Sequence, residues 1–278
     1  MTSFLQDRVV VITGGGGGFG RLIGEQAAAR GARVVLADRD GAAAKEAAAA
    51  IEAAGGVARA ETVDVTDAAQ MDAMAASTVA AYGAIDVMVN NAGVMPLAFF
   101  ADHQQARDAW YACIDINLKG VLNGICAVHD QMIGQGRGHV VNVSSIYANA
   151  GTAGSGVYSA TKAAVAVLSE SLRVESQGTI KVTIVRPTGV MGTGLGAGVV
   201  NPAAIVGLAG QNAGVYAENV EAYQAGTLPP TATDRDEPGY WAITPDIIAD
   251  QVIHAIDQPW GIDIGDVTIR ATGENWIL

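Results

Sequence analysis

Short apolar runs rich in β-branched residues alternate with longer amphipathic or alanine-rich stretches along the first two thirds of the chain. This pattern predicts strands at 9–13, 33–38, 58–65, 85–93, 139–145 and 180–187. It predicts helices between them at 21–30, 42–54, 67–82, 106–133 and 157–176. Strands that are apolar throughout are buried on both faces, and here helices separate them. We therefore expect an α/β fold with a doubly wound parallel sheet.

The segment 191–243 has a different composition. Glycine, alanine, proline and threonine are frequent, and no helical or strand period is clear. The stretch TLPPTATDRDEP (227–238) cannot lie inside a helix or a central strand, because proline lacks a backbone N–H. We expect 191–243 to be a substrate-binding loop or lid without regular elements. A helix near 245–257 and a strand at 266–271 follow, and the absence of repeats or linkers predicts one domain over 1–278.

Composition and charge narrow the classes of protein. The chain has 278 residues, of which 50% are hydrophobic and 16% charged, as in folded globular proteins. No apolar run reaches the roughly 18–20 residues of a membrane span, and the amino terminus, with charges at Asp7 and Arg8, does not match a secretory signal. The formal net charge of −12 argues against nucleic acid as a partner. We expect a cytoplasmic protein with no membrane or nucleic-acid partner.

Cysteine and histidine are too few and too scattered to predict a metal site or a disulfide framework. Their positions are Cys113, Cys126, His103, His129, His139 and His254. None of these spacings matches a metal-ligand motif, so we expect no metal.

A glycine-rich turn follows the first predicted strand. Gly14 to Gly18 are consecutive glycines, and Gly20 follows after Phe19. Backbone N–H groups at the start of a helix carry partial positive charge, and glycines let a pyrophosphate approach them closely. The segment therefore predicts a dinucleotide site, although a flexible turn would have the same composition.

The next strand ends in an acidic residue, which bears on the choice of dinucleotide. Asp38 stands about 20 residues after the glycines, where a carboxylate can accept hydrogen bonds from ribose hydroxyls. The same carboxylate would repel a 2′-phosphate. Arg39 could attract that phosphate, but an exposed mobile side chain counts for less than repulsion at contact distance. We therefore favour NAD over NADP.

Tyr158 and Lys162 are candidates for reacting groups. They are four residues apart in a predicted helix, so their side chains project from one face. A phenol, with an ordinary pKa near 10, needs a nearby positive charge to act as a base near neutrality. The alternative is an exposed helical pair without chemistry.

These motifs together strongly resemble the short-chain dehydrogenase/reductase family over residues 7–190. Thr13, Gly14, Gly18 and Gly20 match its TGxxxGxG motif, Asn90–Gly93 its NNAG, and Tyr158 with Lys162 its YxxxK. The resemblance implies a Rossmann fold. It also implies a cofactor site formed by Gly14, Gly17, Gly18, Phe19, Gly20, Asp38, Arg39, Asp64, Val65, Asn91, Ala92, Gly93, Tyr158, Lys162, Pro187, Val190 and Thr193.

The same resemblance implies roles for four residues. Tyr158 would exchange the proton of a secondary alcohol or ketone, and Ser145, 13 residues earlier, would hold the substrate oxygen. Lys162 would hold the nicotinamide ribose and lower the pKa of Tyr158, and Asn117 would anchor a water chain from the lysine. We therefore expect NAD-dependent hydride transfer between an alcohol and a ketone.

The substrate side is less well defined, because Thr188 stands as an apparent insertion in the family's Pro-Gly step. Met95, Ile146 and Tyr147 are expected in the substrate pocket beside Ser145 and Tyr158. Further candidates for the pocket are Leu195, Leu208, Tyr216, Tyr223 and Trp241, which could instead only pack the loop. We expect a hydrophobic, moderately bulky substrate such as an aromatic, terpenoid or steroid-like alcohol or ketone.

Two other functions remain open from the sequence. One is an epimerase or dehydratase that regenerates its NAD within each cycle, and the other is a non-catalytic NAD-binding regulatory protein. Relatives form dimers and tetramers through helices equivalent to 106–133 and 157–176, so a homodimer or homotetramer is expected. Those helix faces could also only cover the sheet.

Overall fold

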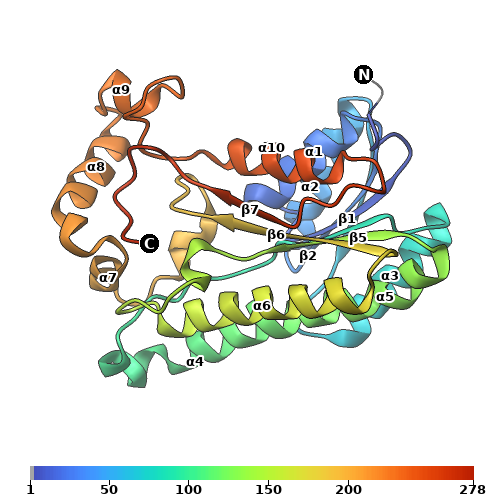
Figure 1. Cartoon of the computed structure of the whole chain (residues 1–278), viewed down its shortest axis with the longest axis horizontal. Coiled ribbons are helices and arrows are strands. Elements are labelled where there is room, and N and C mark those ends of the chain that lie inside the picture. Colours follow the sequence, from blue (N-terminus) through green and yellow to red (C-terminus); the bar gives the residue numbers. More distant parts are fainter. Residues whose placement is uncertain (1–2) are drawn as a thin grey trace.

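A computed structural model describes residues 3–278. These residues form a seven-stranded, fully parallel sheet with the order β3-β2-β1-β4-β5-β6-β7 (Figure 1). The strands are β1 (Val9–Thr13), β2 (Arg33–Asp38), β3 (Val57–Thr62), β4 (Val87–Asn90), β5 (Gly138–Val143), β6 (Ile180–Pro187) and β7 (Asp266–Ile269). The predicted doubly wound parallel sheet is confirmed.

Helices cover both faces of this sheet (Figure 1). One face carries α1 (Gly18–Ala28), α2 (Gly41–Ala53) and α10 (Pro245–Ile256). The other carries α3 (Ala68–Tyr82), α5 (Gly120–Gln135) and α6 (Gly156–Glu175), with α4 (His103–Ile114) beside α6. The helix bounds agree with the predictions within about three residues.

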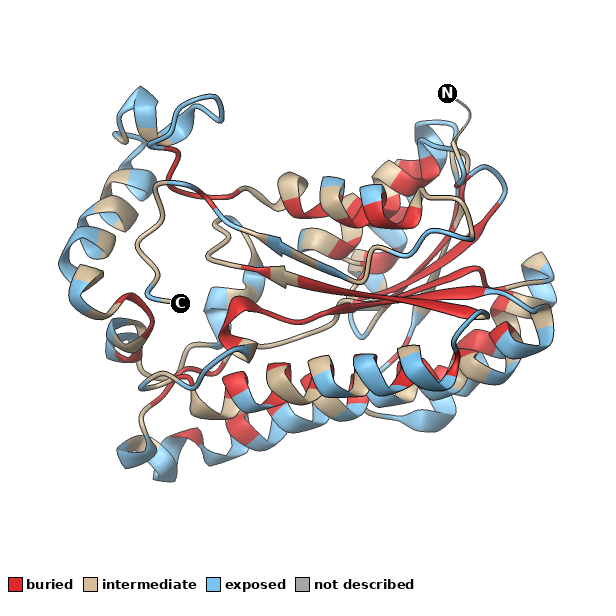
Figure 2. Cartoon of the chain, viewed as in Figure 1, coloured by how far each residue is buried: buried red, intermediate tan, exposed pale blue. Residues whose placement is uncertain are grey.

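The apolar core is divided by the sheet into two layers (Figure 2). Val10 and Ile12 of β1 point into the layer under α1 and α10, and Val11 between them points into the layer under α5 and α6. Successive side chains of a strand alternate between faces. The continuous apolar runs in the sequence therefore follow from burial of both faces.

The helix predicted at 106–133 contains a π-helical turn. Asp115–Lys119 joins α4 to α5, so the helical run extends over Phe100–Gln135. By length and composition alone, this run could cross a membrane. Its apolar side, which includes Val121, Val128 and Met132, packs into the core instead, and core helices commonly have this composition.

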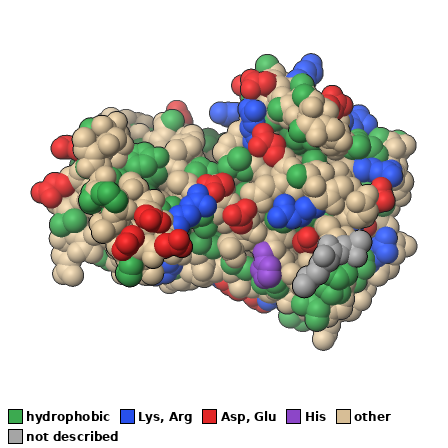
Figure 3. Space-filling view, turned by 90° about the horizontal axis from the view of Figure 1, so that it is seen from above, with side chains coloured by type: hydrophobic (Ala, Val, Ile, Leu, Met, Phe, Trp, Pro, Cys, Tyr) green, Lys and Arg blue, Asp and Glu red, His purple; other side chains and the backbone are tan. Residues whose placement is uncertain are grey.

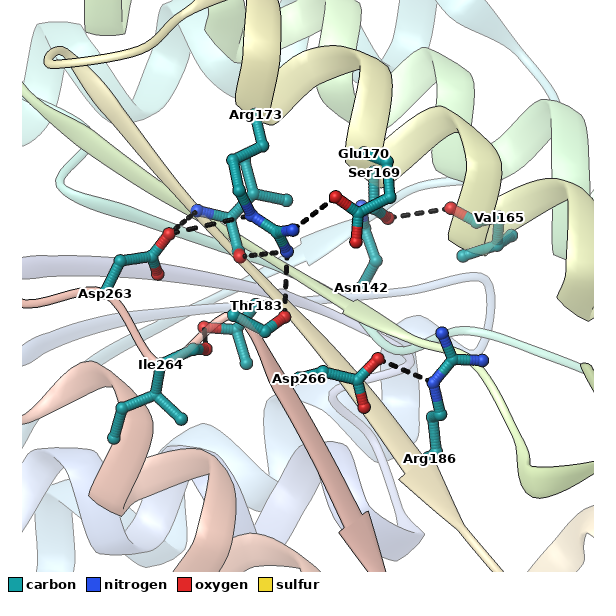
Figure 4. A network of polar contacts seen from close by, with 12 residues as sticks. Asn142, Val165, Ser169, Glu170, Arg173, Thr183, Arg186, Asp263, Ile264 and Asp266 are labelled. Atoms are coloured by element: carbon teal, nitrogen blue, oxygen red, sulfur yellow. Dashed lines mark hydrogen bonds and ion pairs between the residues drawn. The ribbon is translucent and has the colours of Figure 1, made fainter. Parts of the chain in front are cut away.

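The carboxy-terminal strand is held to the sheet edge by polar contacts (Figure 4). Arg173 of α6 donates hydrogen bonds of 2.9 Å to the carbonyl oxygens of Val182 and Gly265. Arg186 of β6 pairs with Asp266 of β7 at 2.7 Å. These contacts fix the position of β7 at the edge of the sheet. The tail that follows β7 therefore starts from a defined position.

The prediction that 191–243 lacks regular elements was wrong. It contains α7 (Val206–Ala209), α8 (Ala213–Ala225) and α9 (Pro230–Thr233), together with short 3-10 turns. The side chains of α8 are all half-buried or exposed, so a buried stripe did not mark it in the sequence. Pro230 lies at the first position of a single-turn helix, where a missing N–H costs nothing.

Acidic and basic side chains are interspersed on the face that carries α10 and the amino-terminal end (Figure 3). Nucleic-acid-binding surfaces need a continuous basic area. The described side chains of this face do not form one.

Candidate active site

A cavity of about 360 Å³ lies at the carboxyl ends of β1, β4, β5 and β6. The strand order reverses here, because β1 lies between β2 and β4, and ligands bind at such a point in doubly wound sheets. The cavity is lined by Gly14, Gly17, Gly18, Phe19, Asp38, Asn91, Ala92, Gly93, Val143, Ser144, Ser145, Tyr158, Lys162, Pro187, Thr188, Val190, Thr193, Gly194 and Leu195. Residues far apart in the sequence are therefore brought together around one space.

The glycine-rich turn leads from β1 into α1. Gly14 and Gly18 have φ of +65° and +50°, values that favour glycine. A Cβ on Gly20 would lie 2.2 Å from the carbonyl oxygen of Gly14, so this glycine packs against the turn and does not line the cavity. Around Gly17, no described atom lies within 4 Å of a Cβ position. The helix start is thus open to a ligand at Gly17 and closed at Gly20.

Asn91 joins the turn to the end of β4. Its side-chain amide donates hydrogen bonds to the carbonyl oxygens of Thr13 (2.9 Å) and Gly14 (3.2 Å). The Thr13 hydroxyl accepts from the backbone N–H groups of Asn91 and Ala92. Asn90 points elsewhere, since its amide donates to Asn142 inside the sheet layer. Within the NNAG segment, Asn91 therefore positions the glycine turn and Asn90 supports the core.

Asp38 lies at the boundary between this cavity and a neighbouring cavity of about 390 Å³. One carboxylate oxygen accepts from the N–H of Gly16 (3.0 Å), and the other accepts from the N–H of Asp40 (2.9 Å). The neighbouring cavity is lined by Gly14, Asp38, Arg39, Val63, Asp64, Val65, Thr66, Ala92, Gly93, Val94, Ala112, Asp115 and Ile116. The two cavities share Gly14, Asp38, Ala92 and Gly93 and together provide an elongated site.

Lys162 of α6 is buried, and its Nζ donates a 2.8 Å hydrogen bond to the carbonyl oxygen of Val143 at the end of β5. Burial lowers the pKa of Lys162 to about 8. The Nζ lies 5.9 Å from the centre of the Tyr158 ring. The ammonium and the phenol thus share one pocket, as four-residue helical spacing requires.

Tyr158 is also buried, and burial raises the pKa of its phenol to about 12, an effect that the Ser145 hydroxyl partly offsets. Ser145 lies directly after β5, and its Oγ accepts from the N–H of Tyr147 (3.2 Å). In the protein alone the phenol is therefore protonated at neutral pH, and its pKa is higher than the sequence argument required.

Asn117 lies within the π-helical turn. Its Oδ1 accepts from the N–H of Val94, and its Nδ2 donates to the carbonyl oxygen of Val94, both at 2.9 Å. A Cβ on Gly93 would lie 3.3 Å from this Oδ1 and 3.5 Å from Nζ of Lys162. The side chain holds the segment after β4 close to the lysine.

A further cavity, of about 230 Å³, adjoins Ser145 and Tyr158 on the side of 191–243. Of the side chains predicted for the substrate pocket, Met95 and Tyr147 line it, whereas Ile146 is buried in the adjoining apolar cluster. Leu195, Leu208 and Tyr216 also contribute, while Tyr223 and Trp241 lie outside the lining.

Trp276, which the sequence did not predict for the site, lines this cavity from the carboxy-terminal tail. The sequence also left the role of Thr188 open. The Thr188 hydroxyl donates to Glu274 of the same tail at 2.5 Å. Neither contact has a local pattern in the sequence, since both join segments at least 60 residues apart.

Comparison with known proteins places this arrangement in a family. Residues 8–202 match the family model described as short chain dehydrogenase. The chain belongs to the short-chain dehydrogenase family. It is 33% identical to an uncharacterized oxidoreductase of Listeria innocua, over 98% of this chain and 99% of that protein. The predicted family is therefore confirmed, and the chain resembles an oxidoreductase over nearly its whole length.

Two solved structures resemble the chain over almost its whole length. A metagenomic short-chain oxidoreductase in complex with NADP is 29% identical, with a TM-score of 0.73 over 96% of this chain and 98% of its own. A short-chain dehydrogenase/reductase of Burkholderia phymatum in complex with NAD is 25% identical, with a TM-score of 0.75 over 95% and 89%. The two differ in cofactor, so the likeness does not choose between NAD and NADP.

Proposed function

We propose that this chain is an NAD-dependent dehydrogenase that interconverts a hydrophobic secondary alcohol and a ketone. The observation that carries the proposal is the shared cavity. The glycine turn, the segment Asn91–Gly93, and the side chains of Ser145, Tyr158 and Lys162 all line it. A nicotinamide dinucleotide, when bound, would supply the hydride acceptor or donor.

The elongated site fits a dinucleotide. Open backbone at Gly17 and Gly18 suits a pyrophosphate, which needs close approach to N–H groups at a helix start. Asp64 and Val65 line the far cavity, where the adenine would lie. Pro187, Val190 and Thr193 line the near cavity beside Tyr158, where the nicotinamide would lie.

Lys162 is suited to hold the nicotinamide ribose. An ammonium has three N–H donors, and Val143 takes one of them. The others remain for ribose hydroxyls. A positive charge 5.9 Å from the Tyr158 ring also favours the phenolate, and so opposes the effect of burial on its pKa.

Tyr158 then exchanges the proton with the substrate oxygen, and Ser145 hydrogen-bonds that oxygen. The buried, protonated phenol is ready to donate a proton to a ketone in the direction of reduction. In the direction of oxidation, the phenol must first lose its proton, which requires the positive charge of Lys162. We propose that Asn117 keeps Val94 and Gly93 in place and supports a proton path from the lysine.

NAD is preferred in this proposal because Asp38 is held rigidly. Two backbone N–H groups fix its carboxylate at the boundary of the two cavities, where a ribose would lie. A 2′-phosphate there would meet a fixed negative charge. Arg39 also lines the far cavity and is the group that could favour NADP.

An NAD-reduction screen tests this function. Hydrophobic secondary alcohols are expected to yield reduced cofactor with NAD, and more slowly with NADP. Small charged hydroxy acids are expected to be poor substrates. Cofactor binding without net reduction by any alcohol would favour an epimerase or a regulatory NAD-binding protein instead.

We also propose that the chain is a cytoplasmic homodimer or homotetramer that pairs through α4, α5 and α6. Apolar side chains are exposed along these helices, among them Tyr111, Leu122 and Val167. Ile125, Cys126 and Leu172 line a shallow groove between α5 and α6. Sedimentation of the wild type beside Val167→Glu tests this pairing, because an introduced charge should dissociate it.

A further inference from the structure

The last residues of the chain return to the active-site end of the sheet. After β7, the tail passes beside α8 (Figure 1). Trp276 of this tail lies between two aromatic side chains from distant segments. The Trp276 ring centre lies 4.7 Å from that of Tyr216 on α8 and 6.2 Å from that of Tyr147, which follows β5. All three rings line the cavity beside Ser145 and Tyr158.

Polar contacts fix this tail against the segment that we propose as a lid, 191–243. The side-chain oxygen of Asn275 accepts from Trp241 Nε1 (2.6 Å) and from Asn219 Nδ2 (3.2 Å). The Asn275 carbonyl oxygen accepts from Asn212 (3.0 Å), on the turn before α8. Asn275 of the tail is therefore hydrogen-bonded to the turn before α8, to α8 itself and to Trp241, which follows α9.

Gly189, which follows β6, leaves room for the indole of Trp276. A Cβ on Gly189 would lie 2.2 Å from Nε1 of Trp276, so a larger residue at 189 would displace the ring. The neighbouring Thr188 is bonded to Glu274. The apparent insertion in the Pro-Gly step thus contacts the tail, which links the main departure from the family pattern to the cavity wall.

The chemistry of the cavity limits what it can hold. Its lining, as far as residues 3–278 describe it, contains no formally charged side chain. Hydroxyls from Ser145 and Tyr158 lie at one end, and Tyr147, Tyr216 and Trp276 contribute aromatic surface. A volume of about 230 Å³ is below the range of about 300–1,000 Å³ usual for drug-sized ligands, which favours a small ring system over a steroid.

We propose that Trp276 is a specificity-determining residue that selects neutral secondary alcohols or ketones with a small aromatic ring next to the reacting carbon. This rests on the proposed function. Aromatic rings pack against one another in tilted or edge-on geometry, and an indole already held in this way loses little freedom when a substrate ring joins it. A flexible open-chain substrate of similar size gains less binding free energy from contact with the same indole, because it loses more freedom on binding.

Two alcohols with the same number of carbon atoms test this selection. We would measure kcat/KM for 1-phenylethanol and for 2-octanol in the wild type, Trp276→Ala and Trp276→Phe. For the ring substrate, Trp276→Ala is expected to lower kcat/KM by about tenfold or more, and Trp276→Phe by about threefold or less. For 2-octanol, the same variants should change kcat/KM by less than about threefold.

Ile277→Ala is the matched control on the same tail. Its side chain meets Gly210 and does not line the cavity, so the preference for the ring substrate should stay at the wild-type value. Thermal unfolding of each variant checks that the substitution in the tail has not unfolded the segment 191–243. Equal losses for both alcohols in Trp276→Ala, or no loss for either, would overturn the selection.

Direct binding separates this proposal from the proposed reaction. Titration with acetophenone by calorimetry, with and without NAD, measures ring binding even if neither alcohol is oxidised. Binding about tenfold weaker in Trp276→Ala supports ring selection, and unchanged binding refutes it. Absence of turnover in all variants, with acetophenone binding retained, would refute only the proposed reaction.

Discussion

Lys162 donates a 2.8 Å hydrogen bond from its ammonium group to the carbonyl oxygen of Val143. The bond joins the middle of α6 to the end of β5, so a buried cation is fixed beside Tyr158 by the fold itself. Burial lowers the pKa of Lys162 to about 8, and it raises that of Tyr158 to about 12. The burial of Lys162 therefore costs stability at neutral pH, and this cost can be measured.

Replacement of Lys162 by methionine should stabilise the protein at neutral pH while removing activity. A lysine whose folded-state pKa lies below its ordinary 10.5 binds fewer protons folded than unfolded, so its presence costs stability that is recovered as pH rises. Lys162→Met should therefore unfold at a higher temperature than wild type at pH 7. The difference in unfolding temperature between the variant and the wild type should become smaller between about pH 8 and 10.5. A loss of activity of about a hundredfold or more is expected.

Scanning calorimetry between pH 7 and 10.5 measures this difference. Lys181, whose pKa is also lowered to about 8, is present in both proteins and cancels in the comparison. A variant that is less stable at pH 7, with no change in the difference across this pH range, would contradict the assignment.

Two glycines of the turn should respond differently to alanine. Gly20→Ala places a Cβ 2.2 Å from the Gly14 carbonyl oxygen and should lower the unfolding temperature. Gly17→Ala has extended backbone and an open Cβ position, so stability should be unchanged. That Cβ would face the cavity, and NAD binding should weaken.

Thermal unfolding and NAD titration of the two variants distinguish these effects. If Gly17→Ala binds NAD as tightly as wild type, the pyrophosphate does not lie at this helix start.

Removal of the Asp38 charge should shift cofactor preference. Asp38→Asn keeps the size of the side chain but removes the repulsion toward a 2′-phosphate and weakens acceptance from ribose hydroxyls. The ratio of kcat/KM for NAD to that for NADP should fall by about ten- to a hundredfold. Arg39→Ala is the complementary variant and should reduce any residual use of NADP. A ratio unchanged in Asp38→Asn would mean that the ribose lies elsewhere.

The sequence predicted the sheet, and it predicted that Tyr158 and Lys162 lie on one face of a helix, because both features depend on local patterns. Apolar runs mark the strands, and four-residue spacing places Tyr158 and Lys162 on one helix face. It could not predict α8, which has no buried stripe, or the π-helical turn, whose Asn117 bonds to Val94 across the fold. Trp276 was missed because its contacts join the tail to segments at least 60 residues away.

The central claim is that Tyr158 exchanges the proton during hydride transfer, and Tyr158→Phe tests it most directly. The variant keeps the ring and loses only the hydroxyl, so NAD should bind within about threefold of wild type while kcat for alcohol oxidation falls by about 10²–10⁴-fold. NAD titration and steady-state kinetics on one preparation give both values. Unchanged cofactor binding with this loss of kcat supports the account. Near wild-type kcat in Tyr158→Phe would contradict it.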